Sequence, residues 1–384
     1  MRLKYPDPGT ESVWDKAPLE GLHAAAPHGR GNEVATRTAI GLDIGTSGVR
    51  AAELSFGKDG VTLEKFGQVA VPEGAVRDGE VVDAPTVSNA IRQLWSHTGF
   101  THKKVVIGVA NQRVVVRTVE LPWMPLNELR KSLPLLVQDF LPMPVEAAVL
   151  DFHPLEEVTD GNGSRQVRGL LVAAAREMVM SNVTAVEAAG LKATMVDLTS
   201  FAVLRSMGKA GVADSETEAL VDIGAKVTNI VVHSGGVPRF VRILLMGGQD
   251  VTDAVADRLG LPQSQAEALK QDIVSADFDH ESVLSAGRAV ESTTAAFVDE
   301  VRGSLDYFAA SNPGGPVQRL VVSGGGSRLR GLAERLALAT RLPVETGNPM
   351  LGLRLGKTGL SDEQVDFVQP LAAVPVGLAL GAAL

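Results

Sequence analysis

The chain has 384 residues, of which 45% are hydrophobic and 21% charged, and its formal net charge is −9. This composition is typical of a globular protein with room for two or three domains. The negative charge argues against a broad nucleic-acid-binding surface, because such surfaces need clustered Lys and Arg. The sequence has no cysteine, which excludes disulfides, thiolate nucleophiles and cysteine-based metal sites and fits a cytoplasmic protein.

The two ends of the chain differ in composition. Residues 1–36 are rich in proline and glycine and have no sustained periodicity, so we expect a disordered N-terminal extension. They also lack the uninterrupted apolar core of a signal peptide. Residues 370–384 are apolar but shorter than the roughly 20 residues of a membrane span, and two prolines and two glycines interrupt them. We therefore expect a buried helix there.

The stretch from Ile40 to Arg50 predicts a strand, a tight turn and a second strand. Apolar residues at positions 40, 42 and 44 alternate with Gly41 and Asp43, which is the period of a β-strand. The turn that follows consists of Gly45, Thr46, Ser47 and Gly48. Backbone amides gathered in such a turn bind phosphate, and the Asp43 carboxylate suits a hydrated Mg²⁺ carried by that phosphate. On its own, the stretch fits an ordinary β-hairpin better.

The same pattern recurs later in the chain. Asp43-Ile44-Gly45 returns 179 residues on as Asp222-Ile223-Gly224, again between two apolar runs. A third turn, Gly324-Gly325-Gly326, follows the apolar residues 320–322 and precedes a helical pattern over 329–340. Three such turns in this order predict two similar lobes that hold one ligand between them.

The segment between the first two turns predicts a small inserted α/β subdomain. Helical spacing over 83–99 precedes two strands, 105–110 and 114–121, which we expect to pair through the turn 111–113. A helix over 127–140, kinked by Pro134, and strands over 149–155 and 168–175 follow. We therefore expect an inserted subdomain over 81–176. The longest predicted helix covers about 282–309.

Two further glycine motifs resemble known nucleotide-binding loops without matching them. Residues 352–358 read Gly-Leu-Arg-Leu-Gly-Lys-Thr, which has three residues between the glycines where a Walker A loop has four. The Gly324 turn has Leu329 where a dinucleotide-binding fingerprint has its third glycine. Neither a P-loop nor a Rossmann site is expected.

With its three glycine turns, the chain resembles the actin-like ATPase superfamily, and within it the PilM family of type IV pilus assembly proteins. The resemblance spans about residues 38–384 and includes the strings at 137–144, 150–152, 171–176, 188–192 and 304–308. It implies the actin-like (ribonuclease H-like) fold, with an inserted subdomain of the kind that PilM and FtsA carry. The lobes would comprise 37–80, 177–213 and 370–384 in the first, and 214–369 in the second.

The resemblance also implies how the turns hold a nucleotide. Phosphates would lie against two sets of residues, Gly45, Thr46, Ser47 and Gly48 from one lobe and Gly224, Ala225 and Lys226 from the other. Asp43 and Asp222 would order Mg²⁺ through its waters. Lys226 departs from the family pattern, in which a smaller residue is usual.

Further residues would contact the nucleoside and the attacking water. Gly324, Gly325 and Gly326 would contact the ribose and adenine, with Glu300 and Ser304 beside the purine. Asp197 would orient the attacking water. The implied cofactors are therefore ATP and Mg²⁺, and hydrolysis is expected to be slow.

The function implied by the resemblance is that of a cytoplasmic ATP-binding scaffold for type IV pilus assembly. Its partners would be the N-terminal peptide of a PilN-like inner-membrane protein and other pilus platform components, with no nucleic acid and with membrane contact only through partners. Phe140 and Met143 are expected to border the peptide groove. Two alternatives stay open at this point: a filament-forming division or cytoskeletal ATPase, and a sugar-kinase-like phosphotransferase of the same superfamily.

Overall fold

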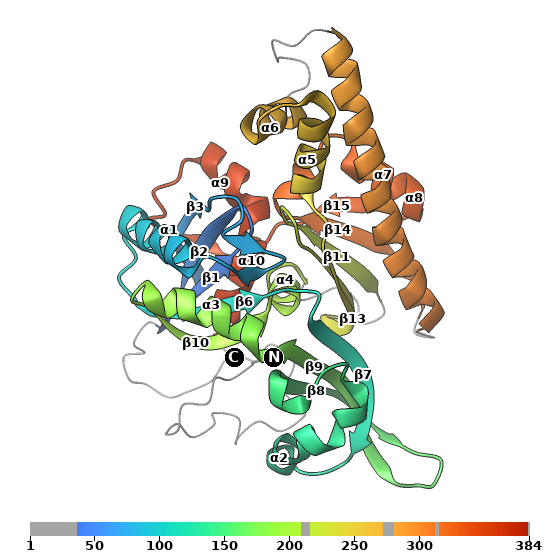
Figure 1. Ribbon diagram of the computed structural model, residues 1–384. Helices are drawn as coiled ribbons and strands as arrows, with labels where there is room; N and C mark the ends of the chain where they lie inside the picture. Colours follow the sequence, from blue (N-terminus) through green and yellow to red (C-terminus); the bar gives the residue numbers. More distant parts are fainter. Residues whose placement is uncertain (1–36, 209–215, 272–279, 312–314, 383–384) are drawn as a thin grey trace.

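The computed structural model describes residues 37–208, 216–271, 280–311 and 315–382, and the predicted extension over 1–36 lies outside them. Two lobes, each built on a β-sheet, stand side by side, and a smaller third unit lies below them in Figure 1. The two sheets have the same plan, which is the architecture predicted by the repeated turn.

The first lobe contains a six-stranded sheet in the order β10-β6-β1-β2-β3-β16. Strands β1, β2 and β3 form an antiparallel meander. On the other side of β1, β6 pairs parallel with β1, and β10 pairs parallel with β6. The strands are β1 (Arg37–Ile44), β2 (Gly48–Gly57), β3 (Gly60–Ala70), β6 (Lys104–Val109), β10 (Lys192–Leu198) and β16 (Arg354–Leu355).

The second lobe contains a five-stranded sheet in the order β13-β12-β11-β14-β15. Its meander of β11, β12 and β13 and its parallel strands β14 and β15 repeat the plan of the first sheet. The strands are β11 (Thr217–Ile223), β12 (Thr228–Ser234), β13 (Val237–Leu244), β14 (Arg319–Ser323) and β15 (Val344–Thr346). Every residue of β11 is buried, because both faces of its sheet are covered.

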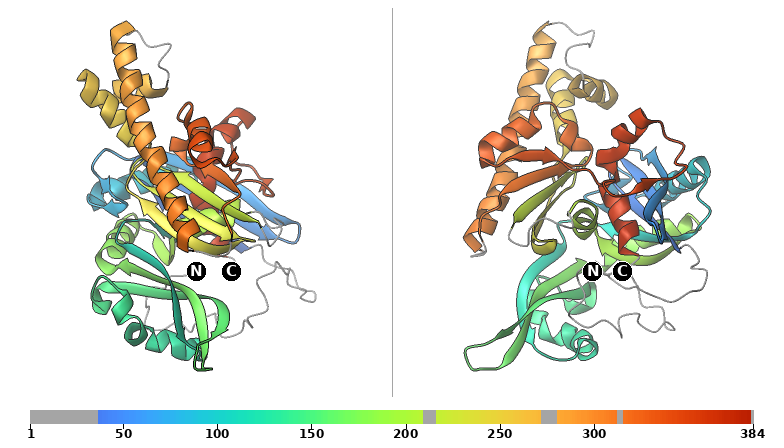
Figure 2. Two further views of the ribbon diagram at one scale, coloured as in Figure 1. Left: turned by 90° about the vertical axis from the view of Figure 1, so that its right-hand side faces the viewer. Right: turned by 180° about the vertical axis from the view of Figure 1, so that it is seen from behind.

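Helices cover both faces of the first sheet. Side chains of α1 (Ala84–Thr98) and α3 (Arg176–Ala188) share one apolar core with the strands. On the other face, α10 (Ala373–Gly381) packs on β1 and on α4 (Thr199–Met207), which also contacts β12 of the second lobe. Figures 1 and 2 show α4 at the centre, between the two sheets.

Two glycines allow α10 to pack closely. A Cβ at Gly41 of β1 would lie 2.0 Å from the carbonyl oxygen of Pro375, and one at Gly377 would lie 1.8 Å from that of Ala202. A larger residue at Gly41 would push α10 off the sheet, and one at Gly377 would push it away from α4. The segment Asp362–Gly381 passes a length-and-hydropathy test for a membrane span, but 56% of it is buried. Because α10 is packed against strands and α4, we assign it to the core, as the sequence predicts.

The helices of the second lobe form its outer side. The long helix α7 (His280–Ser311) packs on the sheet through Phe297, Val301 and Phe308. It also packs on α5 (Gly248–Leu259), which in turn holds α6 (Gln263–Gln271). The remaining helices are α8 (Leu332–Thr340) in this lobe and α9 (Asp362–Val368) near the first lobe.

The third unit is a three-stranded antiparallel sheet in the order β7-β9-β8. Its strands are β7 (Val114–Pro122), β8 (Ala148–Thr159) and β9 (Arg165–Ala175). The helix α2 (Leu126–Leu136), with Pro134 in its last turn, covers one face through Leu129 and Leu133. The sequence predicts a helix over 127–140, but the observed helix ends at Leu136. A separate 3₁₀ turn, Gln138–Phe140, follows it.

The structure corrects two details of the predicted boundaries. Strands β6 and β7 do not pair with each other, because β6 lies between β1 and β10 while β7 pairs with β9. The separate sheet thus begins at residue 114 rather than 81, and α1 and β6 belong to the first lobe. At the other end, Met350 and Val368 pack in the core of the first lobe, so this lobe includes more of the C-terminal region than 370–384.

Candidate functional site

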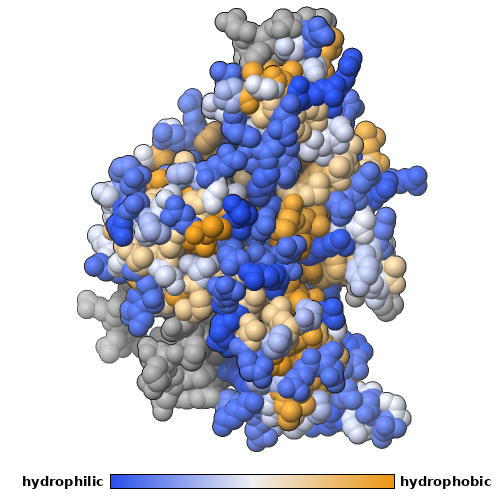
Figure 3. Space-filling model, viewed as in Figure 1, coloured by the Kyte–Doolittle hydropathy of each residue, from blue (hydrophilic) through white to orange (hydrophobic). Residues whose placement is uncertain are grey.

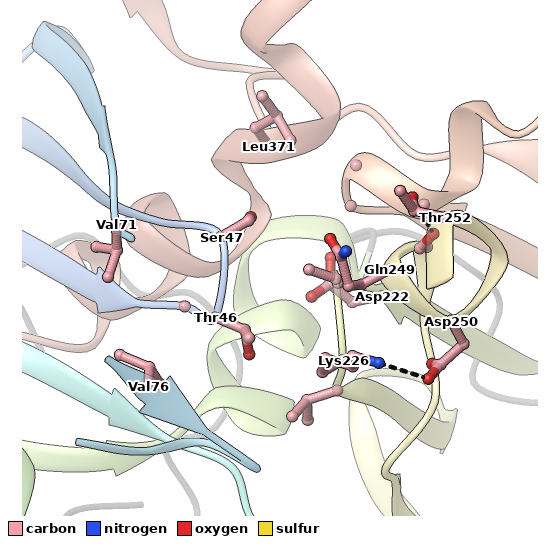
Figure 4. A pocket seen from close by; sticks show the side chains of 18 of the residues that line it. Thr46, Ser47, Val71, Val76, Asp222, Lys226, Gln249, Asp250, Thr252 and Leu371 are labelled. Carbon is pink, nitrogen blue, oxygen red and sulfur yellow. Dashed lines mark hydrogen bonds and ion pairs between the residues drawn. The ribbon is translucent and has the colours of Figure 1, made fainter. Parts of the chain in front are cut away.

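A cavity of about 1280 Å³ lies between the two lobes and is lined by all three glycine turns. On the face drawn in Figure 3, hydrophilic side chains gather between the lobes. Figure 4 shows Thr46 and Ser47 on one side of the cavity and Asp222, Lys226 and Gln249 on the other. Segments that are distant in the sequence thus meet at one site.

The first two turns have the same backbone geometry. In the first, the amide of Gly45 donates to the carbonyl of Gly48 at 3.0 Å; in the second, the amide of Gly224 donates to the carbonyl of Val227 at 3.0 Å. A Cβ at Gly224 would lie 2.6 Å from that carbonyl oxygen, so the tight turn requires glycine. Each turn lines the cavity. Of the predicted phosphate-binding residues in these two turns, Gly48 does not line the cavity, because it is buried at the start of β2.

The third turn, Gly324–Gly326, is packed against the second. Gly324 has a φ of +81°, and a Cβ there would lie 2.3 Å from the carbonyl oxygen of Ile223. Its amide donates to the carbonyl of Pro370 at 2.9 Å. The turn is therefore fixed between the second sheet and the segment that leads into α10, with its glycines facing the cavity.

The two aspartates that precede the first two turns face the cavity from opposite lobes. Burial raises the pKa of Asp222 to about 6, and the charge of Asp43 adds to this, against the hydrogen bond from Ser323 and the charge of Arg50. The Ser323 hydroxyl donates to Asp222 at 2.7 Å. Burial also raises the pKa of Asp43, against the charge of Arg50 3.6 Å away.

This pair of carboxylates suits a hydrated divalent cation. A bound cation would offset the cost of keeping both carboxylates ionised in a buried site. In the described parts of the chain, no group of three or more His, Cys, Asp or Glu is arranged to hold a metal alone. Mg²⁺ commonly binds through one or two carboxylates, retained waters and substrate phosphates, which matches what these residues provide.

Arg50 is a site residue that the sequence analysis missed. It faces Asp43 across the β1–β2 pair, lines the cavity and donates to the Ser47 hydroxyl at 3.4 Å. Among the described residues, its buried Nε has no hydrogen-bond partner. The guanidinium therefore adds positive charge beside the first turn. Its position seven residues after Asp43 was the available signal, because cross-strand neighbours share a face.

A second missed group lies on α5 and α6. Lys270 binds Glu267 at 2.6 Å and donates to the Thr252 hydroxyl at 2.9 Å and to the carbonyl of Gly248 at 3.1 Å. All four residues line the cavity. Hydrogen bonds from Lys270, Thr252 and Gln271 outweigh burial and hold the pKa of Glu267 below its ordinary value. Lys270 uses its three N–H donors within this group, so the Glu267 carboxylate that it holds is the part that can accept hydrogen bonds from hydroxyl groups.

Arg328 and Phe367 form another wall of the cavity. The Arg328 guanidinium, just after the third turn, lies 4.2 Å from the centre of the Phe367 ring. Phe367 is 57% exposed and lies on α9. Both residues line the cavity beside Leu371, so a planar and partly apolar surface adjoins the third turn.

Three predicted site residues lie elsewhere. Asp197 is 1% exposed and its carboxylate is bound by Arg205 and by the amide of Leu198, so it is not among the cavity-lining residues. Glu300 and Ser304, on α7, do not line the cavity either: Glu300 lies 3.8 Å from Arg242, and the buried Ser304 hydroxyl donates to the carbonyl of Glu300. The resemblance implied that Glu300 and Ser304 flank the purine, but residues of α5 and α6, which pack on α7, line the cavity instead.

Phe140 and Met143 lie at the junction of the inserted sheet with the first lobe. Phe140 is 37% exposed, at the end of a 3₁₀ turn. Met143 packs partly against the core of the first lobe, while the neighbouring Leu141 packs against the core under α2. The turn thus connects two apolar cores and leaves an aromatic ring accessible.

A family model described as type IV pilus assembly protein PilM matches residues 41–383. The chain belongs to the PilM family. A solved structure, the PilM-PilN type IV pilus biogenesis complex, is 28% identical with a TM-score of 0.80, covering 90% of this chain and 98% of that one. The predicted family membership and the predicted actin-like fold are both confirmed.

More distant matches agree with the fold. The cell division protein FtsA of Bacillus subtilis is 24% identical over 269 residues, which are 63% of this chain and 59% of the FtsA length. The structure of MreB5 of Spiroplasma citri bound to ADP is 13% identical with a TM-score of 0.51, covering 90% of this chain and 95% of that one. These proteins therefore share the actin-like fold of this PilM-family chain.

Proposed function

We propose that this PilM-family chain is a cytoplasmic ATP-binding scaffold of type IV pilus assembly. The observation that carries the proposal is the pair of equivalent turns, each preceded by a buried aspartate, that face one cavity from two lobes. Such a cavity suits a ligand with several phosphates and a metal ion, because two glycine turns and two carboxylates line it together.

The nucleotide would lie with its phosphates between the turns and its nucleoside toward α6. Arg50 would neutralise phosphate charge, and Asp43 and Asp222 would orient the waters of Mg²⁺. Glu267, held in place by Lys270, would accept the ribose hydroxyls, and the third glycine turn with Arg328 would border the base. The MreB5 structure, which contains ADP, supports this role for the shared fold.

We expect hydrolysis to be slow, because the cavity offers few free carboxylates to orient a water. Of those that line it, Asp43 and Asp222 are assigned to the metal, Asp250 binds Lys226, and Glu267 binds Lys270. Glu73 and Asp78 lie near the short strands β4 (Val76–Arg77) and β5 (Glu80–Val81), outside the two phosphate turns. Turnover well below the roughly 1–100 s⁻¹ of kinases would agree with a scaffold.

The partner would be the N-terminal peptide of a PilN-like inner-membrane protein. The PilM-PilN complex supports a PilN-like partner for this family. The turn at 141–145, with Phe140 and Met143, offers apolar side chains for an extended peptide. Other pilus platform components would join through this partner, which would hold the chain at the membrane.

Thermal unfolding tests the nucleotide proposal directly. A ligand at about 100 times its dissociation constant raises the free energy of unfolding by about 2.7 kcal/mol. Saturating Mg·ATP should therefore raise the melting temperature of the full chain by several degrees, and ATP with EDTA should raise it less. An unchanged melting temperature with Mg·ATP would refute nucleotide binding, whereas co-purification of a membrane partner from cells tests the scaffold role independently.

A further inference from the structure

Lys226 does not extend freely into the cavity, although it belongs to the second phosphate turn. Its ammonium binds two carboxylates of α5, Asp250 at 2.9 Å and also Asp253. Figure 4 shows Lys226 directed toward Asp250. Partial burial alone would lower the pKa of Lys226, but the two carboxylates raise it above the ordinary value. The side chain is therefore a charged link between the turn and α5.

The two carboxylates have different further partners. Asp250 also accepts the amide of Gly247 at 2.7 Å, which fixes the start of α5. Asp253 accepts the side-chain amides of Gln249 and Gln263, each at 3.0 Å and both on Oδ1. Its other oxygen, Oδ2, binds Lys226. Each carboxylate therefore gives one oxygen to Lys226, and only the other oxygen of Asp250 caps the helix.

Lys226 is the member of this group that adjoins the phosphate site. Its turn lines the cavity, as does Asp250, whereas Asp253 lies outside the lining. The carbonyls of Gly224 and Ala225 accept the amides of Gly248 at 2.9 Å and Gln249 at 2.7 Å. The turn and the start of α5 are thus fixed to each other, and the long Lys226 side chain is the flexible part.

We propose that Lys226 and Asp253 form a terminal-phosphate discriminator, in which the last phosphate of a nucleoside triphosphate competes with Asp253 for the Lys226 ammonium. This inference depends on the proposed nucleotide binding. A diphosphate, which lacks that phosphate, leaves Lys226 on α5. A triphosphate draws the ammonium into the cavity and leaves Asp250 and Asp253 without the charge that holds them together.

The competition has two consequences. The Asp253 contact lowers the affinity for triphosphate relative to diphosphate, because a ligand must offset the contact it replaces. The same exchange transmits the presence of the terminal phosphate to α5 and hence to α6 and α7, which pack on it. A nucleotide moves Lys226 from α5 into the cavity only to the extent that it binds the protein more tightly with Lys226 in the cavity.

The test measures the affinities of Mg·ATP and Mg·ADP by calorimetry in Asp253→Asn and in a matched control. Asp257→Asn removes one negative charge from the same helix at an exposed position outside the cavity. We expect Asp253→Asn to tighten Mg·ATP binding about three- to tenfold and Mg·ADP binding less than twofold. Asp257→Asn should change both by less than twofold.

A double variant identifies the group that responds. Adding Lys226→Met to Asp253→Asn should abolish the gain for Mg·ATP, because no ammonium is left to release. The proposal is overturned if both nucleotides gain equally, if the gain survives Lys226→Met, or if neither affinity changes in a folded Asp253→Asn protein. If no variant and no wild-type protein binds either nucleotide, the proposed function fails instead. Melting temperatures without ligand verify folding.

Discussion

Asp43 and Asp222 are each the second-last residue of equivalent strands in the two lobes, and both line the same cavity. Burial raises the pKa of both, and that of Asp222 reaches about 6. Keeping two carboxylates close together in a buried site costs folding free energy when both are ionised. The arrangement therefore links metal binding to the proton occupancy of the site.

The first prediction concerns pH. Because the pKa of Asp222 is about 6 when folded and 3.8 in the reference state, the folded protein binds more protons between these values. The contribution of Asp222 to the free energy of unfolding should therefore fall by about 2 kcal/mol as pH rises from about 4 to about 6. Urea unfolding without Mg²⁺ should show a smaller decline in Asp222→Asn than in wild type. Identical pH profiles would contradict the buried, high-pKa carboxylate.

The second prediction separates the metal from the backbone contacts of the first turn. Asp43→Ala should weaken Mg·ATP binding strongly, because it removes a group that orders the metal waters. Thr46→Ala should weaken it only modestly, because the phosphate contacts of a turn come from backbone amides. Calorimetric titration of both variants with Mg·ATP measures the difference. A larger loss for Thr46→Ala would reverse the assignment.

The third prediction treats Asp197 as a structural residue. Asp197→Ala leaves the mostly buried Arg205 guanidinium without its carboxylate, which should cost about 3 kcal/mol or more of unfolding free energy. The ATP turnover of the remaining folded protein should not change. The double variant Asp197→Ala with Arg205→Met should recover part of the stability. Normal stability with lost turnover would show a catalytic role instead.

The fourth prediction compares residues on two helices. Glu267→Ala and Lys270→Ala should weaken ATP binding about tenfold or more, since hydrogen bonds to charged groups contribute about 1.5–3 kcal/mol. Affinity for inorganic triphosphate, which has no ribose, should change little. Glu300→Ala is the matched control, because Glu300 lies outside the cavity lining. Equal losses of ATP affinity in Glu300→Ala and Glu267→Ala would indicate that the nucleoside lies against α7 instead.

The fifth prediction concerns the partner peptide. Phe140→Ala combined with Met143→Ala should weaken binding of a synthetic PilN-like N-terminal peptide by tenfold or more, because it removes the proposed apolar contacts. Leu135→Ala is the control, since Leu135 is 75% exposed on the neighbouring α2. Fluorescence anisotropy with a labelled peptide measures each affinity. Equal affinities for the double variant and wild type would exclude this junction as the groove.

Local patterns in the sequence determined the two-lobed plan and the three turns. A strand followed by a glycine turn depends on neighbouring residues, so Gly45, Gly224 and Gly324 were recognisable without a structure. The repetition of Asp-x-Gly indicated that two such turns serve one ligand. Turn geometry follows from the steric freedom of glycine, which acts within a few residues.

Only the tertiary structure decided which side chains reach the cavity. Asp197 was expected to orient the attacking water, but its buried carboxylate binds Arg205 on the following helix. The side of the cavity to which we assign the nucleoside is lined by residues of α5 and α6, and α7, which packs on these helices, contributes no described residue to the lining. Lys226 belongs to the second turn but binds carboxylates 24 and 27 residues away. Such pairings depend on packing between distant segments, and no local pattern encodes them.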